Sequence, residues 1–375
     1  MKKFILKGIA LSLLTLGFVS CSSDDDDPWV EPEFINGAYI LNSGKMNNNN
    51  ANLGFYDFET DKYTSKVFFN QNNGTSIGDT GNDMVIYGSK MYILATNSNK
   101  IYITDLKGKL LKYSNGDDAI IDPKNDANEA AKPRFGTSHG GKVYVSLYSG
   151  HVARIDTTSM LIDGKVQVGA FPENLIAVNN NLYVSNAGYG NGETVSIVNL
   201  NQFKETSKLT VTLNPNGLAS DNNGNIYIAS FGKTWGGSNV MPQLQKYNPA
   251  TSELTNLGTD IATKIVMNKD KNKLFIIKEN WDNNGAPAND VTYYDIQKNE
   301  MVTDTYFKIP EGSNVNLKHA YTMSIDPNNG DIYISTSDYS NTGDMHIFSA
   351  DGTYKKSFDT GGINPMGAYF VSRIY

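Results

Sequence analysis

The sequence has almost no cysteine and little histidine. Its 375 residues include one Cys, Cys21, and four His. A single Cys excludes an internal disulfide framework, a Cys-based zinc site and an internal redox pair. The His residues show no i, i+4 pairing that would place two on one helix face: His139, His151, His319 and His346. The sequence therefore predicts no metal site and no cofactor.

Charge is also scarce, and basic residues are in the minority. Charged residues make up 19% of the chain, and 32 Lys and Arg against 39 Asp and Glu give a net charge of −7. A general nucleic-acid binder is excluded, because phosphate binding needs a basic surface. The hydrophobic content of 39%, with 11% aromatic residues, excludes a disordered chain.

The first twenty residues are typical of a secretory signal peptide. Lys2, Lys3 and Lys7 precede an apolar run that ends in FVS at 18–20. The run is slightly short for a transmembrane anchor, and no basic stop-transfer segment follows it. Cys21 is the next residue, and a Cys at this position resembles the lipobox of bacterial lipoproteins. The resemblance implies that residues 1–20 are cleaved off and that the Cys21 thiol is acylated.

Residues 21–35 are expected to form an acidic tether. Four Asp at 24–27 repel one another and keep the segment solvated, and two Pro stiffen it. Cys followed by a short acidic run resembles the surface-export signal of Bacteroidetes lipoproteins. The resemblance implies a protein held on the outer membrane by its lipid anchor alone and facing the cell exterior, with anchoring in the inner leaflet as the alternative.

The rest of the chain is a seven-fold repeat of one strand motif. The motif is AYIL at 38–41, MYIL at 91–94, VYVS at 143–146, LYVS at 182–185, IYIA at 226–229, LFII at 274–277 and IYIS at 332–335. Each copy has an aromatic residue at its second position. A preceding strand ending in an Asn- or Gly-rich turn and two following strands complete each unit.

Four antiparallel strands per unit, repeated along the chain, predict an all-β, seven-bladed β-propeller over 36–375. A β-sandwich would lack the regular aromatic repeat, and a β-helix would repeat at shorter spacing. The one short helical candidate is ANEAAK at 127–132, within a loop. The domain begins at the second strand of its unit, and 363–375 reads as a first strand with nothing after it. We therefore expect the C-terminal strand to complete the N-terminal blade and close the ring.

Candidate ligand-binding residues lie in the loops between second and third strands and between blades. In a propeller these loops gather on one face around the central channel, and here they are long and rich in Asn, Ser and Gly. Aromatic rings among such residues suit a large, polar, neutral ligand. The candidates are Tyr148, Phe171, Tyr189, Phe231, Trp235, Trp281 and Tyr339, with the two Trp as the main anchors.

Signals for catalysis are weak, and the sequence favours a binding protein over an enzyme. Gly136–Gly140 fits the G-x-S-x-G pattern around Ser138, but that motif needs a strand-to-helix elbow, whereas a strand-to-strand turn is expected here. Two Asp- and Asn-rich stretches, 221–224 and 282–284, lack the spaced carboxylates of a calcium loop. A metal centre is disfavoured because the inner strands begin with different residue types, although Glu173 next to Asn174 leaves that alternative open. These residues are Asn82, Arg134, Glu173, Asn216 and Asn364.

The repeated [G/N]-x-[I/L/V]-Y-[V/I]-[S/A] motif behind a lipoprotein leader resembles the YncE-like propeller family over essentially all of 36–375. Within it, the chain is most similar to the BtuG-type surface lipoproteins. That resemblance implies a corrinoid such as cobalamin as the bound ligand and an outer-membrane transporter as the partner. It rests on leader, blade count and loop composition, so alternatives stay open: a glycan-binding or protein-interaction propeller, or an extracytoplasmic propeller lactonase or lyase.

Overall fold

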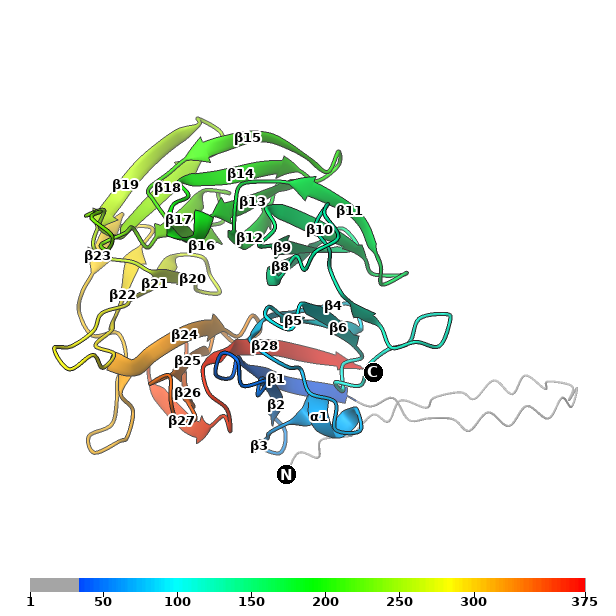
Figure 1. Cartoon of the computed structure of the whole chain (residues 1–375). Helices are drawn as coiled ribbons and strands as arrows, with labels where there is room; N and C mark the ends of the chain where they lie inside the picture. The colour runs from blue at the N-terminus through cyan, green and yellow to red at the C-terminus, as the bar shows by residue number, and fades with distance from the viewer. Residues whose placement is uncertain (1–33, 375) are drawn as a thin grey trace, which may run out of the picture. The chain divides into compact units, whose positions relative to one another are not determined.

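The computed structural model describes residues 34–374, which form seven four-stranded antiparallel sheets arranged as the blades of a ring (Figure 1). The predicted all-β, seven-bladed propeller is thereby confirmed. Within each blade, strands adjacent in the sheet are also adjacent in sequence, except in the blade that closes the ring. None of the helices in this part of the chain is long and apolar enough to cross a bilayer.

In the first three blades, as in the others, the strands follow one another outward from an inner strand. The first blade contains β28 (Pro365–Ile374), β1 (Phe34–Asn42), β2 (Asn52–Asp57) and β3 (Lys62–Thr64). The second contains β4 (Gly81–Tyr87), β5 (Lys90–Ala95), β6 (Lys100–Thr104) and β7 (Ile120–Ile121). The third contains β8 (Pro133–His139), β9 (Lys142–Leu147), β10 (His151–Asp156) and β11 (Ile162–Gln167).

The remaining four blades follow the same order. The fourth contains β12 (Pro172–Val178), β13 (Asn181–Asn186), β14 (Thr194–Asn199) and β15 (Lys204–Thr210). The fifth contains β16 (Pro215–Ser220), β17 (Ile226–Ser230), β18 (Gln243–Asn248) and β19 (Glu253–Thr259). The sixth contains β20 (Lys264–Met267), β21 (Lys273–Lys278), β22 (Asp290–Asp295) and β23 (Glu300–Val302). The seventh contains β24 (Ala320–Ile325), β25 (Ile332–Thr336), β26 (Asp344–Phe348) and β27 (Tyr354–Asp359).

Helical structure is confined to short connections. In residues 34–374 it comprises α1 (Val67–Gln71) and the 3₁₀ turns η1 (Gly188–Gly190) and η2 (Leu317–His319). The helical candidate at 127–132 does not form a helix. Asn125 Oδ1 accepts hydrogen bonds from the backbone N–H groups of Ala127 and Glu129 instead. Such side-chain bonds compete with the helix for the same donors.

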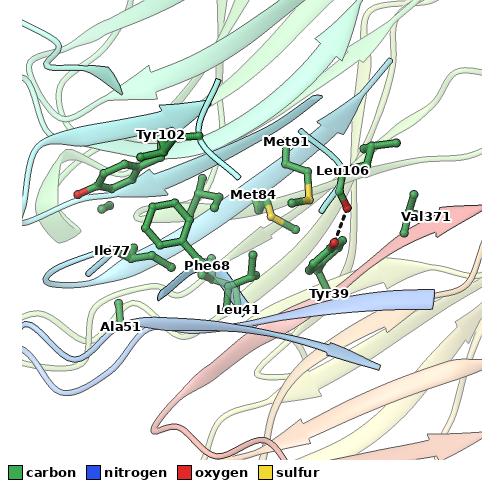
Figure 2. Packing of buried hydrophobic residues seen from close by; sticks show 14 of the residues in the cluster. Tyr39, Leu41, Ala51, Phe68, Ile77, Met84, Met91, Tyr102, Leu106 and Val371 are labelled. Atoms are coloured by element: carbon green, nitrogen blue, oxygen red, sulfur yellow. Dashed lines mark hydrogen bonds between the residues drawn. The ribbon is translucent and has the colours of Figure 1, made fainter. Parts of the chain in front are cut away.

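The repeated aromatic residue forms the core between blades. Its seven copies are all buried: Tyr39, Tyr92, Tyr144, Tyr183, Tyr227, Phe275 and Tyr333. Figure 2 shows the cluster between the first two blades, where Tyr39 donates a hydrogen bond to the Leu106 carbonyl and lies near Met84 and Met91. Full burial of a large apolar side chain contributes about 1.5–3 kcal/mol. A repeat of such residues therefore holds each blade to the next.

The turn residues act as their composition predicts. Asn179 and Asn180 connect β12 to β13, and both have positive φ, at 48° and 63°. Two consecutive residues with positive φ give the type I′ turn that matches the twist of a two-residue hairpin. Asn adopts this conformation more readily than other residues with a Cβ.

The ends of the described chain meet in the first blade, as expected. β28 pairs antiparallel with β1 from Phe34 opposite Ile374 to Leu41 opposite Gly367. β28 also packs against both β4 and β24, the inner strands of the blades on either side. The C-terminal strand thus supplies the inner strand of the N-terminal blade and closes the ring.

Candidate functional site

A cavity of about 500 Å³ lies at one end of the central channel. Its rim includes Met46 from the β1–β2 loop, Phe231 from the β17–β18 loop and Tyr339 from the β25–β26 loop. Its walls come from the starts of the inner strands, including Asn82, Arg134, Asn174, Asn216, Lys264, Tyr321 and Asn364. The second-to-third-strand loops therefore surround a hollow of the size typical for small-molecule sites.

Arg134 is held on one side of the cavity by a buried polar network. Its Nε and Nη2 donate to Glu173 Oε2 at 2.9 and 2.7 Å, and its Nη1 donates to Asn82 Oδ1. The Tyr148 hydroxyl donates to the other Glu173 oxygen at 2.6 Å, and the Arg134 guanidinium lies 4.7 Å from the Tyr148 ring centroid. Burial raises the pKa of Tyr148, so the hydroxyl stays protonated and remains a donor to Glu173.

Lys264 forms a second ion pair, contributed by the sixth blade. Its Nζ lies 2.6 Å from Glu279 Oε1 and donates to the Tyr321 carbonyl at 2.8 Å. The same ammonium lies 4.2 Å from the Tyr321 ring centroid, a cation–π geometry. Burial raises the pKa of Tyr321 to about 12, so its hydroxyl is also a neutral donor.

The cavity thus carries balanced charge. Arg134 and Lys264 in its wall each have a carboxylate partner, so a charged ligand would have to displace an existing ion pair. In the cavity lining, Asn174 Oδ1 is buried without a hydrogen-bond donor among the described residues. An unpaired buried polar atom is costly unless a ligand or water satisfies it, and the Asn174 amide oxygen suits an uncharged ligand that donates a hydrogen bond.

Three of the predicted aromatic residues form one cluster above the Arg134 network. Phe171 lies between the other two, with ring centroids 5.3 Å from Tyr148 and 5.4 Å from Tyr189. Tyr189 is 76% exposed, whereas the Tyr148 hydroxyl is fixed by Glu173. None of the three rings lines the cavity, and the cluster runs from the Arg134–Glu173 pair outward to the surface.

Trp281 and Tyr339 form a second aromatic surface, beside the Lys264 pair. Their rings stack with centroids 5.5 Å apart, and Tyr339 meets Tyr321 edge-on at 5.6 Å. Tyr339 lines the cavity, while Trp281 is 58% exposed. A ligand at the mouth could therefore contact the free face of Trp281.

The structure places the last two predicted residues differently. Phe231 lines the cavity. Trp235 is 55% exposed and packs its ring edge beside Gly190, outside the residues that line the cavity. Neither Trp lines the cavity, but Trp281 stacks on the lining residue Tyr339.

Three of these aromatic residues have a strained backbone. Phe171, Tyr189 and Tyr339 have positive φ, at 45°, 54° and 64°. Bulky side chains rarely adopt this region, and each such residue costs on the order of 1–3 kcal/mol. Strain of this kind is concentrated at binding and catalytic sites, and here it fixes the direction of three rings at the rim.

The weak catalytic and metal motifs adopt ordinary local structure. Ser138 lies near the end of β8, in a hairpin to β9 and not in a strand-to-helix elbow. Asp221 and Asp282 accept backbone hydrogen bonds within their own turns. Within residues 34–374, no group of three or more His, Cys, Asp or Glu is placed to hold a metal ion.

Part of the site was not predictable from the sequence. Arg134 and Glu173 stood out only as mixed residues that argue against a metal centre, and Lys264, Glu279 and Tyr321 were not predicted at all. The partners are far apart in sequence, since Arg134 and Glu173 are separated by 39 residues. The usable signal is positional, because Lys264 and Tyr321 both lie where an inner strand begins.

Fold and cavity together define a closed seven-bladed propeller with a ligand-sized, charge-balanced hollow at the loop end of its channel. Residues 36–370 match the DUF5074 family, described as a domain of unknown function, and the chain belongs to that family. No curated protein sequence is significantly similar to it.

Solved structures resemble the chain in fold alone. Hydrazine synthase of Kuenenia stuttgartiensis is 12% identical with a TM-score of 0.57, covering 76% of this chain and 88% of its own. A quinonprotein alcohol dehydrogenase-like protein of Bacteroides thetaiotaomicron is 14% identical with a TM-score of 0.59, covering 89% and 78%. A candidate 6-phosphogluconolactonase of Bacteroides uniformis is 13% identical with a TM-score of 0.59, covering 90% and 100%. At these identities the matches carry no function across.

Proposed function

We propose that the protein is a surface lipoprotein that captures an uncharged polar ligand at the propeller cavity, with a corrinoid such as cobalamin as the first candidate. The observation that carries the proposal is the combination at one channel end of two neutralised ion pairs and two strained aromatic clusters. Corrinoids are large, flat and rich in carboxamides, so they can use ring contacts and neutral hydrogen bonds together. In this proposal, an outer-membrane transporter receives the ligand.

A second candidate is a glycan. It is supported by the exposed rings of Trp235 and Trp281 in loops rich in Asn and Gly, because a flat aromatic face also stacks on a sugar ring. A protein-interaction scaffold or a lactonase or lyase would use the same face, but the Ser–His pairs Ser149–His151 and Ser357–His346 lie outside the cavity lining. We therefore propose binding without a reaction.

Calorimetry with cyanocobalamin, and in parallel with soluble glycans, tests the proposal. Trp281→Ala removes a ring worth on the order of 1–3 kcal/mol, so affinity should fall by about 5- to 150-fold. Trp235→Ala should weaken binding less, because Trp281 stacks on the lining residue Tyr339 whereas Trp235 packs beside Gly190. Phe69→Ala is the matched control, since Phe69 is an exposed aromatic residue on α1 away from the cavity.

The outcomes separate the candidates. Cobalamin binding that Trp281→Ala weakens and Phe69→Ala leaves alone supports corrinoid capture. Glycan binding without cobalamin binding favours the second candidate. Absence of both contradicts the proposed function.

A further inference from the structure

Part of the cavity lining is apolar. The cavity continues between the sixth and seventh blades, where its lining becomes apolar: Val266, Phe275, Ile277 and Met323. All four belong to one hydrophobic cluster that joins these two blades. We call this part of the cavity the blade 6–7 slot.

Strand register fixes which side chains face the slot from the sixth blade. Val266 is paired opposite Phe275, and Lys264 opposite Ile277. Residues directly opposite in antiparallel strands project from the same face of the sheet. Glu279, two residues beyond Ile277, continues that face and meets Lys264.

The seventh blade supplies the facing wall. Tyr321 and Met323 are two residues apart on β24 and therefore project from one face. From the rim inward the two walls present the stacked rings of Trp281 and Tyr339, then the Lys264–Glu279 pair over Tyr321. Below that pair the slot is lined by hydrocarbon side chains and the Met323 thioether.

We propose that the blade 6–7 slot is a subsite for an uncharged, planar aromatic group of the ligand. Facing sheets lie about 10 Å apart with side chains filling most of the space between them, and Phe275 and Ile277 are only 1% and 2% exposed, so the gap that the cavity opens here is thin and suits a flat group. Thioethers and ring edges make favourable contacts with aromatic rings, and Met323 and Phe275 provide one of each. The ion pair at the entrance offers no unpaired charge, so a neutral group passes it at the least cost.

This inference deepens the proposed function, on which it rests for its biological meaning, by naming the chemistry of the part of the ligand that enters deepest. It is tested with a probe that is independent of corrinoids. N-phenyl-1-naphthylamine is neutral, aromatic and fluorescent in apolar surroundings. Saturable fluorescence enhancement with the whole protein is the expected result.

Two variants fill the slot from opposite walls. Met323→Trp and Val266→Trp should each weaken probe binding by about tenfold or more, because the added ring takes the space of the probe. Ile309→Trp is the matched control, since Ile309 is an exposed apolar residue outside both the cavity lining and the cluster that joins these two blades. It should change probe affinity by less than about twofold.

A measurement on the unaltered protein covers the case in which the variants fail to fold. With ¹³C-methyl-labelled methionine, the Met323 signal should shift on probe addition, whereas Met160, which packs in a different cluster, should not respond. Met323→Leu assigns the signal. A Met323 signal that stays unchanged at probe saturation, or folded slot variants with full affinity, overturns the subsite.

Failure of the subsite and failure of the proposed function give different results. Probe binding blocked by Met323→Trp in a protein that binds no cobalamin keeps the slot and removes the corrinoid. Cobalamin binding with no probe binding does the reverse.

Discussion

At the scale of single residues, His346 is the clearest buried titratable group. It is 2% exposed on β26, and its Nδ1 lies 2.6 Å from Ser357 Oγ. Burial lowers its pKa from 6.5 to about 4, because the charged imidazolium loses its hydration. The folded protein therefore keeps this ring neutral at a pH where the unfolded chain already binds a proton.

This difference predicts a pH-dependent loss of stability. The contribution of neutral His346 is fully present above pH 6.5 and is lost progressively as pH falls toward about 4. The full loss is about 3 kcal/mol, at about 1.4 kcal/mol per pKa unit. Buried Asp83 opposes it, since burial raises the pKa of that carboxyl to about 6. Denaturant unfolding should therefore compare the protein with His346→Asn at each pH.

The comparison isolates His346 because both proteins retain Asp83. The stability advantage of the original protein over His346→Asn should shrink as pH falls through this window. A difference that stays constant with pH would show that the ring is protonated or exposed in the folded protein.

The roles of single residues were predictable from the sequence where the same residue type recurs in each blade. The buried Tyr series was visible because each blade needs the same core residue at the same strand position. The rim rings were visible because Trp281 and Tyr339 lie in long loops. The pairs Arg134–Glu173 and Lys264–Glu279 were not, because ring geometry and not sequence spacing brings them together.

At the scale of elements, β28 is the strand that closes the ring. It pairs with β1 along its length, and its Tyr369 hydroxyl donates to Asp83 Oδ1 on β4 at 2.8 Å. The prediction that this strand closes the ring was available because the first unit lacked an inner strand and the chain ended on one. The Tyr369–Asp83 bond was not foreseen, since it joins residues 286 positions apart.

Truncation after Asn364 should therefore abolish the closed ring. It leaves β1 with an unpaired edge and exposes the apolar residues that β28 covers, which favours edge-to-edge association. Size-exclusion chromatography should show aggregates, and the melting temperature should fall far below that of the full chain. Tyr369→Phe is the matched control: it removes one hydrogen bond to Asp83 and should cost about 1–3 kcal/mol without aggregation. A monomeric truncated protein with an unchanged melting temperature would contradict ring closure by β28.

At the scale of the whole molecule, location and affinity are predicted to reside in separate parts of the chain. The predicted leader and Cys21 lie outside the described residues, whereas the cavity lies entirely within 34–374. Ligand affinity should therefore be independent of lipidation. Delivery to a membrane partner should depend on it, because an anchor raises the local concentration of the bound ligand at that membrane.

Cys21→Ala tests this division. Cells labelled with a radioactive fatty acid should show label on the original protein and none on the variant, while purified variant should bind ligand with unchanged affinity. Replacing each of the four Asp residues at 24–27 with Asn is the matched control, because it keeps the Cys21 thiol and removes only the acidic run. That variant should carry lipid. It should also become resistant to protease added to whole cells, whereas the original protein is digested. Protease resistance of the original protein in intact cells, with digestion after lysis, would contradict exposure at the surface. Fatty acid on Cys21→Ala would contradict the lipidation site.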